Sequence, residues 1–72
     1  MILTTIINHQ LCIRFDTWVK EGTIIITDDN QYRRLINFTD SDFEIIDIPD
    51  NRHHMRVIIN IGEEKIIKSL KL

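Results

Sequence analysis

The chain has 72 residues, a formal net charge of −2 and a single cysteine, Cys12. This length predicts one domain spanning residues 1–72. The lone thiol excludes an internal disulfide and fits a reducing cytoplasm better than secretion. We expect neither a signal peptide nor a membrane span, because no apolar run approaches the ~18 residues that a transmembrane helix needs.

The composition favours β-structure. Isoleucine occurs 16 times, valine 2 times and threonine 6 times, whereas alanine is absent. β-Branched side chains suit a pleated surface, while alanine is the strongest helix former. Turn-forming residues recur about every eight to twelve positions, as they do in a small barrel or compact sheet.

The first half of the chain predicts two hairpins. Residues 2–7 are apolar and β-branched, and residues 11–16 alternate between apolar and polar side chains after a polar break. This pattern is typical of two strands joined by a turn. Glu21-Gly22 predicts a further turn, and residues 22–38 then have the pattern of strand, turn and strand.

A short helix is the alternative for the segment that ends this second hairpin. Asp28 and Gln31 have the spacing of helix-capping residues, and Tyr32, Leu35 and Ile36 would form the buried stripe. The hairpin is favoured, because the same residues also alternate between the two faces of a strand.

The second half predicts two more strands. Residues 39–42 are polar and predict a turn, and residues 43–48 predict a strand that Pro49 ends, since proline cannot donate to the ladder. A loop is expected through residues 49–55, followed by a strand at residues 56–61.

The C-terminal segment predicts a short helix over residues 63–72. Its glutamates come early and its lysines late, which suits the helix dipole, and Glu64 and Lys68 form a favourable i,i+4 pair. The alternative is a last strand that closes a hairpin on residues 56–61.

These elements predict a mainly β domain of the β-rich α+β type. We expect a small antiparallel sheet, or an SH3-like, partly open barrel, of about five strands with a short C-terminal helix. The likeness to SH3-like barrels rests on length and turn spacing, and by itself it implies no function.

Adjacent isoleucines recur along the expected strands. They occur at residues 6–7, 24–26, 45–46, 58–59 and 66–67. Neighbouring side chains of a strand point to opposite faces, so these strands are apolar on both faces. Since a chain of this size covers only one face of its own sheet, we expect the other face to pack on a second copy, as a homodimer, or on a partner protein. The expected contacts are Ile25, Ile46 and Ile58, or their opposite-face neighbours. The alternative is that outward isoleucines are tolerated in an isoleucine-rich chain.

One basic concentration stands out in an acidic chain. It comprises Arg33, Arg34, Arg52, His53, His54 and Arg56. If the loop after Pro49 lies near the central hairpin, these residues form a positive patch, and Trp18, Tyr32 and Phe43 offer stacking faces. Small barrels bind single-stranded RNA or DNA in this way, although the net negative charge argues against it.

No catalytic, metal-binding or cofactor-binding pattern is present. The adjacent His53 and His54 would point apart on regular structure, and the carboxylates match no calcium-binding loop. Neither a nucleophile elbow nor a glycine-rich phosphate loop occurs. Most carboxylates fall in expected turns, and an acidic face that binds a basic protein surface or mimics nucleic acid is the alternative function for them.

The sequence therefore favours a non-enzymatic, cytoplasmic protein-binding module. We expect a small regulator or inhibitor of the phage type that docks to a partner protein. Single-stranded nucleic-acid binding is the alternative. Salt distinguishes the two, because apolar docking should survive ~0.5 M salt while phosphate contacts should not.

Overall fold

The computed structural model describes residues 2–29, 32–48 and 54–71. In this part of the chain, five strands form one antiparallel sheet, which confirms the mainly β prediction. The strands are β1 (Ile2–Ile7), β2 (Gln10–Asp28), β3 (Arg33–Asp47), β4 (His54–Ile61) and β5 (Glu64–Lys71).

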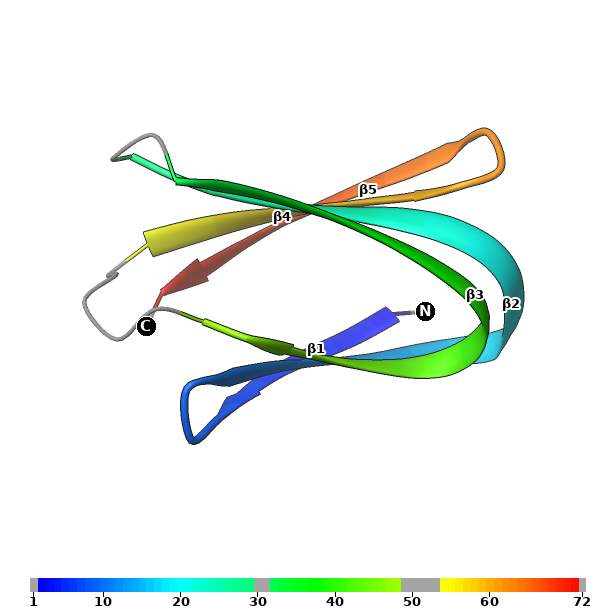
Figure 1. Cartoon of the computed structure of the whole chain (residues 1–72), viewed down its shortest axis with the longest axis horizontal. Helices are drawn as coiled ribbons and strands as arrows, with labels where there is room; N and C mark the ends of the chain where they lie inside the picture. Colours follow the sequence, from blue (N-terminus) through cyan, green and yellow to red (C-terminus); the bar gives the residue numbers. More distant parts are fainter. Residues whose placement is uncertain (1, 30–31, 49–53, 72) are drawn as a thin grey trace.

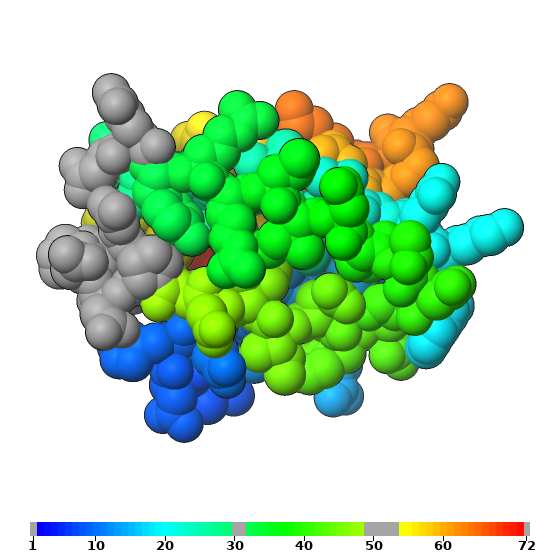
Figure 2. Space-filling model, in the orientation of Figure 1, coloured from blue at the N-terminus to red at the C-terminus, as the bar shows by residue number. Residues whose placement is uncertain are grey.

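The two long strands, β2 and β3, bend over together and so belong to two layers (Figure 1). The upper layer of Figure 1 has the order β3–β2–β4–β5, and the lower layer has the order β3–β2–β1. The sheet thereby curls into half a barrel with the core between its layers. Figure 2 shows β3, in green, crossing one side of the molecule from layer to layer.

A register irregularity lies at the bend. Between the pairs Arg14–Phe43 and Val19–Ser41, β2 advances by five residues while β3 advances by two, so β2 carries three extra residues. Extra residues on one strand increase its local twist and bend it. On β3, Asp40 has a φ of 50°, a left-handed conformation in which aspartate is enriched.

Ser41 supplies the polar contacts inside this bend. It is the one buried polar residue in the described part of the chain. Its hydroxyl donates to Oε2 of Glu44 at 2.6 Å and accepts the backbone N–H of Phe43 at 3.2 Å. The buried hydroxyl is therefore hydrogen-bonded, as burial requires.

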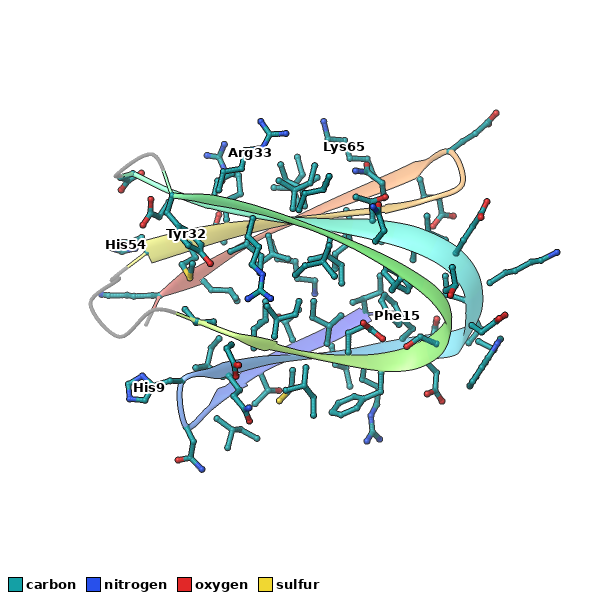
Figure 3. All side chains as sticks on the ribbon, viewed as in Figure 1. His9, Phe15, Tyr32, Arg33, His54 and Lys65 are labelled. Atoms are coloured by element: carbon teal, nitrogen blue, oxygen red, sulfur yellow. The ribbon has the colours of Figure 1, made fainter. Side chains whose placement is uncertain are left out.

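An aromatic pair fills the inner side of the bend. Phe15 of β2 (labelled in Figure 3) and Phe38 of β3 are stacked with ring centroids 5.2 Å apart, and each is 5% exposed. Phe38 lies opposite Gly22, and a Cβ on Gly22 would come within 2.5 Å of the Phe38 ring. Glycine is required here for this close approach.

Across the bend, the inward-facing residues of β2 change from odd-numbered to even-numbered positions. Leu11 and Ile13 are buried in the lower layer, whereas Ile24 and Ile26 are buried in the upper layer. The irregular segment between them absorbs the change, so both halves of β2 turn an apolar face to the interior. The rest of the buried apolar core consists of Ile2, Phe15, Val19, Phe38, Ile46, Ile48, Met55, Val57 and Ile59.

Two tight turns join the outer hairpins. Asn8 and His9 link β1 to β2 with φ angles of 50° and 63°, the pattern of a type I′ turn. Gly62, with a φ of 58°, links β4 to β5 at the first position of a two-residue turn, where a type II′ turn requires glycine. Both turns match the right-handed twist of their strands.

The helix expected over residues 63–72 is wrong for the described residues, and the alternative of a last strand is confirmed. β5 pairs with β4 from Ile61–Glu64 to His54–Lys71. Gly62 turns the chain back, and the inward side chains of β5 then follow a period of two. The hairpin at residues 22–38 is confirmed over its helical alternative.

The turns expected at Glu21-Gly22 and at residues 39–42 are also wrong. Both segments lie within continuous strands, at the bend that β2 and β3 share. The strand expected at residues 43–48 is the end of β3, which stops at Asp47, one residue earlier than expected. Residues 49–53 of the expected loop lie outside the described residues, and its last two residues, His54 and Met55, already belong to β4.

Replacing Gly22 by alanine is expected to lower the free energy of unfolding by about 1–3 kcal/mol, because overpacking a filled core displaces its neighbours. The Phe38 ring cannot swing aside freely, since it is buried and stacked on Phe15. Urea denaturation of the two proteins measures the difference. In a Phe38→Leu background the same substitution should cost less, and an equal cost would show that the ring is not the obstacle.

Candidate protein-binding faces

The outward sides of the two layers carry most of the exposed apolar surface. The described large hydrophobic residues that are exposed are Leu3, Ile7, Trp18, Leu35, Phe43, Ile45 and Ile67. Trp18 lies in the irregular part of β2, and the other six lie on the outward sides of regular strand pairs. These six divide between two faces, one that carries a surplus of cations and one whose charges balance.

A row of four apolar side chains crosses the upper layer. Leu35, Ile25, Ile58 and Ile67 pair in register from β3 through β2 and β4 to β5. The two end residues, Leu35 and Ile67, are each 56% exposed, while the two central isoleucines are half-buried. The row therefore spans the width of the layer without interruption.

Polar rows lie on both sides of this apolar row. One consists of Asn37, Thr23, Asn60 and Lys65, and the other of Arg33, Thr27, Arg56 and Ser69. These twelve side chains, which we name the cationic face, include three cations and no carboxylate. In Figure 3, Arg33 and Lys65 both project from the upper layer away from the core.

One further cation, Lys71, lies beyond the arginine row. His54 and Lys71 pair across β4 and β5, and both are exposed. A hollow of about 530 Å³ opens there between the ends of β2, β4 and β5, and its charged lining residues are two cations, Arg56 and Lys71, and two carboxylates, Asp28 and Asp29. This hollow is large enough for a side chain of a partner, and its lining is mostly polar.

The outward side of the lower layer forms a three-by-three grid. Its rows are Leu3–Arg14–Phe43, Thr5–Cys12–Ile45 and Ile7–Gln10–Asp47. Four of the nine side chains are exposed large hydrophobics, between 41% and 55% exposed. We name this grid the neutral face, because it contains one cation and one carboxylate.

Both charges of the neutral face have partners within it. The guanidinium of Arg14 lies 5.5 Å from the centre of the Phe43 ring, a cation–π contact. Asp47 accepts a hydrogen bond from Nε2 of Gln10 at 3.0 Å. Neither charge therefore depends on an external counter-charge.

The residues expected to contact a partner occupy different places. Ile25 and Ile58 lie side by side in the cationic face. Ile46 is 4% exposed and belongs to the core, and its outward neighbour is Ile45, which is 54% exposed. Each isoleucine pair thus has one inward and one outward member, and the apolar surplus lies on the outward sides.

The basic patch expected from the sequence is brought together in part. Arg33, His54 and Arg56 lie toward one end of the cationic face. Arg34 lies on the other side of β3, where its Nη1 donates to the backbone carbonyl of Asp47 at 3.3 Å. The remaining two members, Arg52 and His53, lie outside the described residues.

Leu35, Ile67 and Lys65 are members of the cationic face that were not among the contact or patch residues expected from the sequence. Because a helix was expected there, Lys65 and Ile67 were not aligned with their neighbours on β4. In the structure they pair with Asn60 and Ile58. Reading the C-terminal segment as a strand would have placed both of them on the outward side.

The described residues contain no cluster of three or more histidine, cysteine, aspartate or glutamate side chains able to hold a metal ion. Among the same residues, no helix has the length and apolarity to cross a membrane. No protein-family model matches the chain, and no curated protein is significantly similar to it.

Substitutions of the adjacent residues Ile45 and Ile46 on β3 test which of the two side chains faces water and which faces the core. Ile45→Glu should change the free energy of unfolding by no more than about 1 kcal/mol, because its side chain faces water. Ile46→Glu should lower it by about 4 kcal/mol or more, because it buries an unpaired carboxylate. Urea titrations of dilute protein measure both, and similar losses in the two variants would contradict this register.

Proposed function

We propose that the chain is a non-enzymatic protein-binding module that docks through its cationic face. The observation that carries this proposal is the apolar row of Leu35, Ile25, Ile58 and Ile67, flanked by three cations and no carboxylate. An exposed apolar stripe with a polar rim is the pattern of a docking surface.

The chemistry of the face favours an acidic partner. The apolar row supplies surface to remove from water, and each fully buried aliphatic side chain contributes roughly 1.5–3 kcal/mol. Arg33, Arg56 and Lys65 would then orient a partner that carries carboxylates around its own apolar centre. Lys71, in the lining of the hollow beside Arg56, would add one further N–H donor group for a carboxylate of the partner.

A role as a small regulator or inhibitor, of the kind that phages encode, fits this mode of action. Such a protein acts by occupying a surface of its target and needs no catalytic group. The half-buried free thiol of Cys12 supports a reducing, cytoplasmic setting.

Single-stranded nucleic acid is the second candidate ligand. It is favoured by the gathering of Arg33, His54 and Arg56 toward one end of one face. Of the three aromatic residues considered for base stacking, Phe43 belongs to the neutral face, Trp18 lies in the bend, and Tyr32 is partly buried against the core. The centre of the cationic face is aliphatic, which suits a protein surface better than a base.

The test is capture from a nuclease-treated lysate of the cells that encode the chain, with washes at ~0.5 M salt. Wild type, Ile67→Glu and Ile45→Glu serve as baits, because the two isoleucines are equally exposed on different faces. We expect an acidic protein that wild type and Ile45→Glu retain and that Ile67→Glu binds at least about tenfold more weakly.

The nucleic-acid alternative is measured in parallel by fluorescence anisotropy with a single-stranded oligonucleotide at ~50 mM salt. Salt-sensitive binding that Arg33→Gln and Arg56→Gln weaken, together with no protein retained at high salt, would replace the proposed function by this alternative.

A further inference from the structure

The neutral face is a second exposed apolar surface, on the opposite side of the molecule from the cationic face (Figure 1). We propose that it binds a second copy of this chain, in a two-fold symmetric dimer centred near Cys12. The assignment of a second copy to this face rests on charge and on the arrangement of the grid.

The charge argument follows from two-fold symmetry. A symmetric dimer presents the same surface patch from both copies, so a face with a net charge meets a face with the same net charge. On the cationic face, Arg33, Arg56 and Lys65 of one copy would approach those of the other with no carboxylate between them. The homodimer contact expected through Ile25 and Ile58 is therefore disfavoured.

The neutral face lacks this repulsion. Its one cation, Arg14, is held over Phe43, and its one carboxylate, Asp47, accepts the hydrogen bond from Gln10. The net charge of the grid is zero, so two copies can approach without an unbalanced field. Four exposed hydrophobic side chains then supply the contact: Leu3, Ile7, Phe43 and Ile45.

The position of Cys12 fixes the expected centre of the contact. Cys12 lies on the central strand and in the central row of the grid, between Thr5 and Ile45. A two-fold axis that passes through the middle of the grid therefore places Cys12 opposite its own copy. Its thiol is half-buried in one chain and would be covered in the dimer.

The size of the grid predicts a weak dimer. With strands ~4.8 Å apart and a rise of ~3.4 Å per residue, the nine same-face positions cover a flat area of roughly 300 Å². Stable complexes bury about 800 Å² on each partner, which this grid reaches only if its rim also takes part. The dimer should therefore exchange with monomer and depend on protein concentration.

The dimer has a functional consequence, which rests on the proposed function. Because the two faces lie on opposite layers, pairing through the neutral faces leaves both cationic faces directed outward. One dimer would then bind two acidic partners, or two sites on one assembly, with the gain in avidity that linked sites provide.

Analytical ultracentrifugation from ~5 µM to ~1 mM protein tests self-association directly. Wild type should shift from monomer to dimer over this range, and Ile45→Glu should weaken the dimer at least about tenfold, because it buries a carboxylate at the contact. Ile67→Glu, which is matched in exposure but lies on the cationic face, should dimerise as wild type does. A monomer at every concentration, or an equal loss in the two variants, would overturn the proposal.

The thiol of Cys12 provides a second measurement. Its rate of reaction with excess Ellman reagent should fall as wild-type concentration rises and should stay constant in Ile45→Glu. A concentration-independent rate in a wild-type protein that does dimerise would place the contact elsewhere. These measurements use no partner, so the dimer and the proposed function stand or fall separately.

Discussion

The shared bend of β2 and β3 is the constraint on which the rest of the molecule depends. A straight hairpin of this length would leave both of its faces in water. Folding it over brings Ile13 of the lower layer and Ile24 of the upper layer into one core, with Phe15 and Phe38 stacked on the inner side of the fold. The bend thereby makes a core possible in a chain this small, and it aims the outward sides of the two layers in opposite directions.

The bend also explains which parts of the fold the sequence could predict. The composition and the alternation of side chains predict strands, and they also predict that isoleucines point to both faces of these strands. Both are local properties of the sequence. The bend itself was mistaken for turns at Gly22 and at Asp40. Glycine and aspartate serve a turn and a sharply bent strand for similar backbone reasons, so the residue types alone do not distinguish them. The deciding contact, Phe38 against Gly22, depends on the exact register of the β2–β3 pair, which the sequence pattern does not fix.

The C-terminal strand shows a second limit of local sequence reasoning. Ile66 and Leu70 share a face both in a helix and in a strand, and the charge order of the segment favours a helix. Pairing with β4 overrides that preference, because it satisfies the backbone of β5 and covers the open side of β4. Lys68 occupies an inward position of this strand, and its Nζ donates to the backbone carbonyl of Ile2 at 2.9 Å, which links β5 to β1 across the open side of the half-barrel.

The cationic face and the neutral face expose similar apolar side chains and differ in their charge. Ile45 and Ile67 are similar in type and in exposure, yet one stands in a grid whose charges cancel and the other in a set of twelve side chains with three cations and no carboxylate. The net charge of the whole chain is −2, so the cationic face exists only because the fold moves most carboxylates to the bend, the turns and the strand edges. The surplus of apolar residues can therefore be predicted from the sequence. Their separation into a cationic and a neutral face cannot, because it depends on which residues become neighbours across strands. A surface with a net charge favours a partner of opposite charge over its own copy, whereas a balanced surface is compatible with its own copy.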